Sequence, residues 1–159
     1  MKGKKKYLLL FISLFVIILD QTTKLLVRMN IDYGEIVKVW GNFLRFIHRM
    51  NPNAVFGINV GGPTVSLILT LVAFVFVCYL FYKSHEKLFL VSLSLIIGGA
   101  VGNLIDRFIF HAVTDFIDVG LGGYRFATFN VADSAVTIGI ILSLISFLLE
   151  SRASSSDNP

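Results

Sequence analysis

Long stretches without any charged side chain alternate with short polar connections along the chain. Asp, Glu, Lys and Arg are absent from residues 7–19, 50–82, 88–105 and 134–149. A helix that crosses a membrane needs about 20 mostly apolar residues. The pattern therefore predicts four membrane-spanning helices, near residues 7–26, 63–82, 88–110 and 130–150.

The composition supports a membrane protein and excludes other classes. Of the 159 residues, 55% are hydrophobic and 15% are charged, whereas a soluble domain carries roughly 25% charged residues. Aromatic residues make up 13% of the chain and there is a single cysteine, so an intrinsically disordered chain and a secreted disulfide scaffold are also excluded. Residues 1–150 are predicted to form a single membrane-embedded domain, and residues 151–159 a flexible cytoplasmic tail.

The N-terminus allows two interpretations, because four lysines between residues 2 and 6 precede the first apolar stretch, as in a cleavable signal peptide. The apolar stretch is followed by Asp20-Gln21-Thr22-Thr23-Lys24, however, where a signal peptide has a small-x-small cleavage site. We therefore expect a retained first helix with its lysines in the cytoplasm.

The distribution of basic residues indicates the orientation. The N-terminal lysines and the connection at residues 83–87 are both typical of cytoplasmic segments, although with both termini inside the Lys and Arg residues divide equally, seven on each side. The first helix usually dominates, so we expect cytoplasmic termini in a bacterial cytoplasmic (inner) membrane. The basic composition then reflects orientation, and no nucleic-acid partner is expected.

Two segments, 27–62 and 111–129, lie on the outer side in this topology. Residues 35–40 and 43–48 are β-prone runs on either side of Gly41-Asn42, which predicts a hairpin. Residues 111–129 contain three glycines and are expected to form an irregular loop or short strands. The predicted fold class is thus an all-α polytopic membrane protein of four transmembrane helices with a small extracytoplasmic β-hairpin or sheet platform.

Acidic residues gather at the outer ends of the predicted spans: Asp20, Asp106, Asp115, Asp118 and Asp133. An ionisable group at membrane depth is costly unless it is paired or hydrated, so these residues are functional candidates. Two carboxyl groups brought together push their pKa values apart, and such a pair can activate a water molecule and protonate a leaving amine. Asp115 and Asp133 are placed for this role.

Structural roles explain some of these residues equally well. Asp133 suits the first turn of a helix and Asp115 a solvated loop, and two carboxylates can also bind an ion or cap a helix. Asp20 and Lys24 stand at i and i+4 and are expected to form an ion pair. Arg107 shares a helix face with Asn103, and it either reaches to the interface or holds a peptide carbonyl or a lipid headgroup.

Other chemistries find little support in the sequence. Cys78 lies within an apolar span without a nearby base, and we interpret it as a packing residue. His48, His85 and His111 are scattered over both sides of the membrane, so we expect no metal site and no cofactor. Ser134 has no histidine nearby in the sequence and suits a helix start.

Five short motifs follow one another along the chain: residues 20–24 (DQTTK), 51–57 (NPNAVFG), 98–107 (GGAVGNLIDR), 113–116 (VTDF) and 129–134 (FNVADS). In these motifs and in their order, the sequence resembles the lipoprotein signal peptidase (bacterial signal peptidase II) family over residues 7–150. Asn53 and Val55 depart from the family pattern, which usually has glycine and alanine there. Asn adopts a positive φ more readily than most residues, so the departure affects the expected shape of the substrate loop rather than the activity.

The resemblance implies an intramembrane aspartyl endopeptidase with Asp115 and Asp133 as its catalytic pair. It further implies that Asn51, Asn103, Arg107 and Asn130 shape the substrate pocket, that Asp20 and Lys24 support the site, and that Asp106 is structural. The implied substrate is a diacylglyceryl-modified prolipoprotein, cut just before its lipidated cysteine at the outer face of the membrane. The implied partners are this substrate and membrane lipids, and the chain is expected to be monomeric.

The alternative class is a small non-enzymatic membrane protein, such as a proton-coupled carrier subunit or an assembly factor, whose acidic residues relay protons. Such a protein would carry its charges near the middle of its spans. The charges of this chain instead gather at one interface, which favours hydrolysis.

Overall fold

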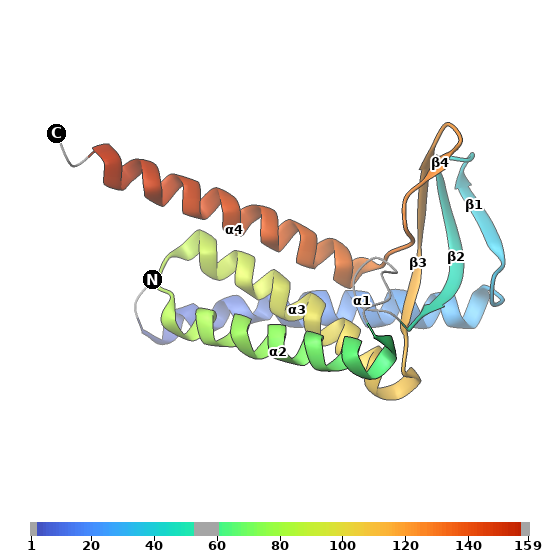
Figure 1. Cartoon of the computed structure of the whole chain (residues 1–159), viewed down its shortest axis with the longest axis horizontal. Helices are drawn as coiled ribbons and strands as arrows, with labels where there is room; N and C mark the ends of the chain where they lie inside the picture. The colour runs from blue at the N-terminus through green and yellow to red at the C-terminus, as the bar shows by residue number, and fades with distance from the viewer. Residues whose placement is uncertain (1–2, 53–60, 157–159) are drawn as a thin grey trace.

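Four long helices run along a common direction, and a small sheet lies across one end of them (Figure 1). The computed structural model describes residues 3–52 and 61–156. A short 3-10 helix, η1 (Lys4–Leu9), leads directly into the first long helix. The long helices are α1 (Leu10–Asn30), α2 (Gly62–Lys83), α3 (Lys87–Phe110) and α4 (Val131–Ser156).

All four helices are long and apolar enough to cross a membrane, over Lys4–Asn30, Gly62–Lys83, Lys87–Phe110 and Val131–Arg152. The predicted fold class is therefore confirmed. Helix α4 continues to Ser156, so helical backbone enters the segment for which a flexible tail was expected.

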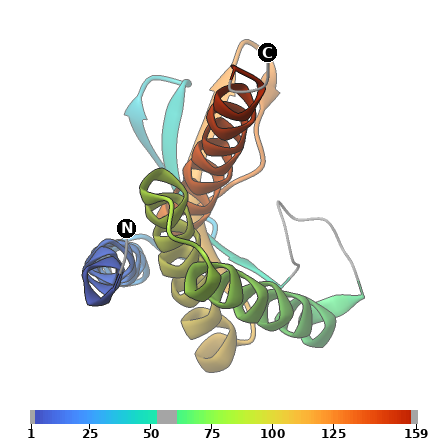
Figure 2. The same cartoon turned by 90° about the vertical axis from the view of Figure 1, so that its left-hand side faces the viewer.

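Helix α3 lies at the centre of the bundle, against the other three helices (Figure 2). Glycines make this packing possible: a Cβ atom added at Gly98 would lie 2.8 Å from the Cβ of Val16 on α1, and one at Gly139 on α4 would lie 2.6 Å from Ile96. Small residues let helix backbones approach closely where apolar lipid offers no driving force for association. The buried core beside these contacts consists of Phe81, Leu90, Leu93 and Ile97.

The sheet has the strand order β1-β2-β3-β4, and all its neighbouring strands are antiparallel. The predicted hairpin is present as β1 (Ile36–Trp40) and β2 (Leu44–Asn51). Segment 111–129 is more regular than expected, because it contains the nine-residue strand β3 (Val113–Leu121) as well as β4 (Tyr124–Arg125). The reason is long-range: β2 supplies β3 with an antiparallel partner along its length, and no local pattern in the sequence reveals this pairing.

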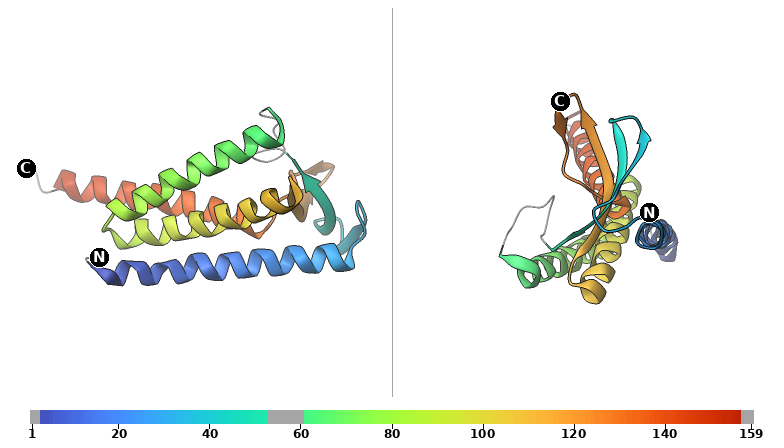
Figure 3. Two further views of the ribbon diagram at one scale, coloured as in Figure 1. Left: turned by 90° about the horizontal axis from the view of Figure 1, so that it is seen from below. Right: turned by 90° about the vertical axis from the view of Figure 1, so that its right-hand side faces the viewer.

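The sheet and the chain termini lie at opposite ends of the bundle (Figure 3). At the end away from the sheet, Lys6 donates a hydrogen bond to the carbonyl oxygen of Tyr82 at 2.5 Å, and Glu86 caps the start of α3. At the sheet end, His111 ends α3 with a left-handed backbone (φ 57°), and β3 begins two residues later. This turn brings the first residues of β3 beside α1 and α3.

Candidate active site

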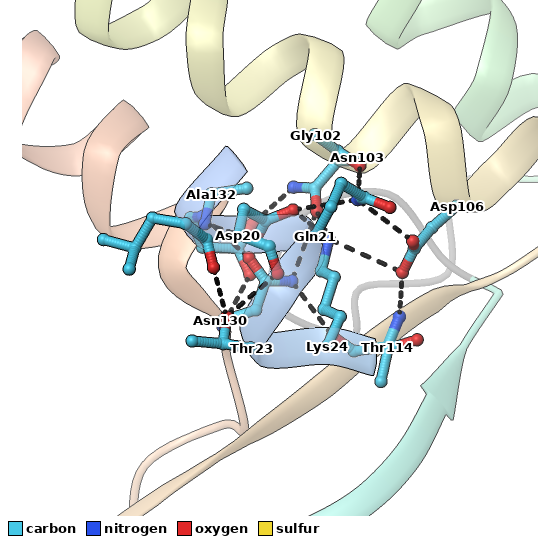
Figure 4. A network of polar contacts seen from close by, with 12 residues as sticks. Asp20, Gln21, Thr23, Lys24, Gly102, Asn103, Asp106, Thr114, Asn130 and Ala132 are labelled. Carbon is cyan, nitrogen blue, oxygen red and sulfur yellow. Dashed lines mark hydrogen bonds and ion pairs between the residues drawn. The ribbon is translucent and has the colours of Figure 1, made fainter. Parts of the chain in front are cut away.

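Polar side chains from five elements meet where the helices join the sheet, and Figure 4 shows part of this network. Asp20 and Lys24 come from α1, Asn103 and Arg107 from α3, and Asp115 from β3. Asn130 precedes α4, Asp133 lies in its first turn, and Asn51 ends β2. The structure thus gathers most of the residues that the sequence singled out into one connected network.

Asp115 is almost completely buried, with 2% of its surface exposed. Each carboxylate oxygen accepts a hydrogen bond at 2.8 Å, Oδ1 from the Asn130 amide and Oδ2 from the Asn51 amide. Both donors are neutral, so this carboxyl group is held in a fixed orientation without a salt bridge. Asp115 is therefore a side chain of the protein interior and not the solvated loop residue that one interpretation of the sequence allowed.

Asp133 is bound to Asn130 in a reciprocal arrangement at the start of α4. The Asn130 side-chain oxygen accepts from the Asp133 backbone N–H at 2.9 Å, and Asp133 Oδ2 accepts from the Asn130 backbone N–H at 3.2 Å. This is the geometry of a capping box, which satisfies N–H groups at a helix start. The other oxygen, Oδ1, accepts from the Asn103 amide at 2.8 Å. Asp133 thus caps a helix and also faces the network.

The charge of Asp133 acts on the carboxyl group of Asp115. Burial and, second to it, the nearby charge of Asp133 raise the pKa of Asp115 to about 7, although hydrogen bonds from Asn51 and Asn130 act in the opposite direction. A carboxyl group with this pKa is largely protonated just below neutral pH, when an ordinary aspartate is ionised. The site therefore offers a proton donor on Asp115.

Lys24 determines how the Asn103 amide is turned. Its ammonium group is fully buried, and it can only donate hydrogen bonds. Because Lys24 Nζ lies 2.9 Å from Asn103 Oδ1, the amide nitrogen of Asn103 points away from Lys24 and toward Asp133. A cation on α1 thereby ensures that the Asp133 carboxylate meets a donor rather than an acceptor.

The charge of Lys24 is itself balanced by buried carboxylates. The expected i,i+4 ion pair is present, with 2.8 Å between Lys24 Nζ and Asp20 Oδ2, and Asp106 Oδ2 lies 3.5 Å from the same nitrogen. Asp20 Oδ1 also accepts from the Ala132 backbone N–H at 2.9 Å, which joins α1 to the first turn of α4. These contacts fix the relative positions of α1, α3 and α4 around the network.

An apolar cavity of about 450 Å³ opens between α2, α3 and α4 and reaches this network. Most of its wall is aliphatic or aromatic, and its charged and amide side chains are Asn103, Arg107 and Asp133. The remaining lining residues are Leu69, Thr70, Ala73, Phe74, Val77, Ile96, Ala100, Val136, Thr137 and Ile140. The cavity can therefore hold an elongated apolar ligand with one polar end beside Asp133.

Other residues that the sequence singled out lie outside this network. Asp118 does not join the network, because it pairs with Arg45 and Arg125 of the sheet at 2.6 Å each. Asn53 and Val55 lie outside the described residues. Among residues 3–52 and 61–156, no group of three His, Cys, Asp or Glu side chains could hold a metal ion.

Sequence reasoning did not single out three further members of the network. Gln21 donates to the Gly102 carbonyl at 3.0 Å, and Arg28 donates to the Thr114 hydroxyl at 2.9 Å. Gln21 and Thr114 each stand next to a singled-out aspartate and have no charge of their own. Arg28 follows Lys24 by four residues, so it lies on the same face of α1, and this spacing is the signal that could have found it.

Comparison with known proteins gives a consistent result. A family model described as "Signal peptidase (SPase) II" matches residues 12–149. Lipoprotein signal peptidases of Staphylococcus aureus strains JH9 and Newman are each 39% identical over 149 residues, which cover 91% of this chain and 91% of the relative.

Two solved structures of bacterial membrane enzymes, both obtained by the in meso method, have the same fold. One has a TM-score of 0.82 and 36% identity, covering 90% of this chain and 88% of the other. The second has a TM-score of 0.79 and 37% identity, covering 88% and 92%. The chain is therefore a peptidase that belongs to the signal peptidase II family.

Proposed function

We propose that Asp115 and Asp133 are the catalytic pair of an intramembrane aspartyl endopeptidase that removes the signal peptides of diacylglyceryl-modified prolipoproteins. The observation that carries this proposal is the position of the two carboxyl groups: they share Asn130 as a hydrogen-bond partner, and Asp133 stands at the polar end of an apolar cavity. Hydrolysis of an amide needs one group that accepts a proton from water and one that donates a proton.

The cavity suits the apolar part of a signal peptide. Its walls come from three membrane helices, so a substrate helix that lies in the bilayer can enter between them without crossing a polar surface. The scissile bond, just before the lipidated cysteine, would then reach Asn103, Arg107 and Asp133. Arg107 is 7% exposed, and we assign it to a carbonyl oxygen of the substrate, since a guanidinium donates well to such acceptors.

The proton positions define the order of the reaction. We assign the proton to Asp115, because of its raised pKa, and the negative charge to Asp133, whose neighbour Asn103 is held by the Lys24 ammonium group. Asp133 takes a proton from water while the oxygen of that water attacks the scissile carbonyl carbon, and Asp115 polarises the carbonyl oxygen. When the C–N bond breaks, the proton held by Asp133 passes to the departing amine.

The remaining residues support this chemistry from outside the reacting atoms. Asn51 and Asn130 orient Asp115, whereas Lys24 acts on Asp133 through Asn103. We further propose that the chain works as a monomer in the bacterial cytoplasmic membrane, with residues 1–150 as a single domain, both termini in the cytoplasm, and the site at the outer face.

A pair of matched substrates tests the reaction and the substrate class together. The purified chain in detergent is given the same prolipoprotein before and after diacylglyceryl transfer to its cysteine. We expect cleavage of the lipidated form just before the cysteine and little cleavage of the unmodified form. Equal cleavage of both forms would indicate a general signal peptidase, and cleavage of neither would contradict the proposed reaction.

A further inference from the structure

The residue that precedes Asp115 is held by several partners at once. The backbone N–H of Thr114 donates to Asp106 Oδ2 at 2.8 Å, its hydroxyl accepts from Arg28 Nη1 at 2.9 Å, and its carbonyl accepts from Asn130 at 3.3 Å. Thr114 is fully buried. Its backbone position therefore cannot change without breaking contacts to three other segments of the chain, and the neighbouring Asp115 must follow any such change.

Arg28 provides the side-chain contact between the last turns of α1 and this residue. Its Nη1 atom also lies 3.6 Å from Asp106 Oδ1, and its guanidinium stands over the Phe110 ring, 4.7 Å from the ring centroid. The side chain is 18% exposed. The ion pair and the stacking hold the planar guanidinium in one orientation. In this orientation Nη1 donates its hydrogen bond to the Thr114 hydroxyl.

The Thr114 hydroxyl has a second partner that fixes its own direction. It lies 3.6 Å from Met50 Sδ, which can only accept a hydrogen bond. The hydroxyl hydrogen therefore points to the sulfur, and a lone pair faces Arg28. With β2 on one side and α1 on the other, the first residues of β3 are held in place laterally as well as along the strand.

We propose that Arg28 is a positioning residue for the reaction: through Thr114 and Asp106 it sets the location of the Asp115 carboxyl group. The proposal rests on the proposed function, because it treats Asp115 as catalytic. A reacting group displaced by as little as about 1 Å can lose up to about 100-fold in rate. Arg28 acts at the end of β3 where Asp115 lies, so a small shift there is transmitted directly.

The position of Arg28 predicts which kinetic constant it affects. Arg28 is not among the residues that line the apolar cavity, so its loss leaves the binding of a signal helix unchanged. Placement of Asp115 matters only when the bond is cleaved. Substitution of Arg28 should therefore lower kcat and leave KM nearly unchanged, whereas general loosening of the fold would reduce the active fraction and the thermal stability together.

Four variants test the proposal in the prolipoprotein assay: Arg28→Met, Arg28→Lys, Thr114→Val and the double variant Arg28→Met with Thr114→Val. Loss of one charge-assisted hydrogen bond predicts a kcat lower by about tenfold in Arg28→Met and in Thr114→Val. Arg28→Lys keeps a cationic donor and should recover most of the rate. The double variant should be no slower than Arg28→Met, since the two side chains act through the same contact.

Arg45→Met is the matched control, because Arg45 also binds an aspartate of β3, Asp118, which keeps a second partner in Arg125. It should retain wild-type kcat. Asp115→Asn, assayed alongside, separates the two proposals: if it cleaves normally, the catalytic assignment is wrong. If Asp115→Asn is inactive while Arg28→Met and Thr114→Val keep wild-type kcat, only the positioning role is overturned. If Arg28→Met fails to fold, a wild-type kcat in Thr114→Val still refutes the positioning role of Arg28.

Discussion

Replacement of Lys24 by methionine is expected to destabilise the fold strongly. Methionine has nearly the same length but carries no charge and donates no hydrogen bond. Lys24 Nζ lies 2.8 Å from Asp20 Oδ2, 3.5 Å from Asp106 Oδ2 and 2.9 Å from Asn103 Oδ1. The substitution removes all three interactions from a site without solvent exposure.

The magnitude follows from the two carboxylates that remain. Asp20 and Asp106 are both 0% exposed, and removal of one partner of a buried ion pair typically costs about 3–5 kcal/mol. Asp106 keeps a contact with Arg28 at 3.6 Å, so most of the loss comes from Asp20. For a chain of this size the expected decrease in the midpoint of thermal unfolding is about 10 °C.

Thermal unfolding in detergent micelles measures this decrease. Lys38→Met is the matched control, since Lys38 lies on the exposed strand β1, and its midpoint should stay within about 1 °C of wild type. Addition of Asp20→Asn to Lys24→Met should restore part of the lost stability, because it removes the unpaired charge. A midpoint for Lys24→Met equal to that of Lys38→Met would refute the conclusion that Lys24 neutralises the buried carboxylates.

Three further predictions concern separate parts of the molecule. Burial and the charge of Asp133 raise the pKa of Asp115 to about 7. As the pH rises through about 7 and Asp115 loses its proton, kcat/KM should therefore fall. A kcat/KM that rises over this range would contradict the role of Asp115 as the proton donor. Trp40 is the only tryptophan and is 72% exposed on β1. If the sheet lies at the membrane interface, brominated lipids should quench the fluorescence of Trp40 in vesicles. An unquenched signal would place Trp40 in water. A Cβ at Gly102 would lie 2.6 Å from Asp20 Oδ2, so Gly102→Ala should lower the free energy of unfolding by about 1–3 kcal/mol. A Cβ at Gly123 would have no atom within 4 Å, so the control Gly123→Ala should unfold like the wild type.

The fold was largely predictable because a membrane imposes a simple pattern on the sequence. Uncharged stretches mark the spans, and the helices α2 (Gly62–Lys83) and α3 (Lys87–Phe110) each lie within one residue of the predicted bounds at both ends. The hairpin was predictable because Gly41-Asn42 separates two β-prone runs. Strand β3 was not, because its regularity depends on pairing with β2, which is distant in the sequence.

The candidate site was predictable in its charged members and less so in its neutral ones. A charged residue is rare in an apolar chain, which is why Asp20, Lys24 and Asp133 stood out. Thr114 is polar but common in strands, and its contacts with Arg28 and Asp106 come from elements separated by the α3–β3 turn. Sequence spacing contains no information on which hydroxyl meets which guanidinium across such a turn.

Cleavage of a diacylglyceryl-modified prolipoprotein by aspartate-to-asparagine variants tests the central claim most directly. Asp115→Asn and Asp133→Asn preserve the size of each side chain and remove its ability to exchange a proton, and Asp118→Asn is the control on the same strand as Asp115. We predict no detectable cleavage by the first two variants, with folding intact, and cleavage at close to the wild-type rate by the third. Wild-type activity in either Asp115→Asn or Asp133→Asn would contradict the assignment of these residues as the catalytic pair.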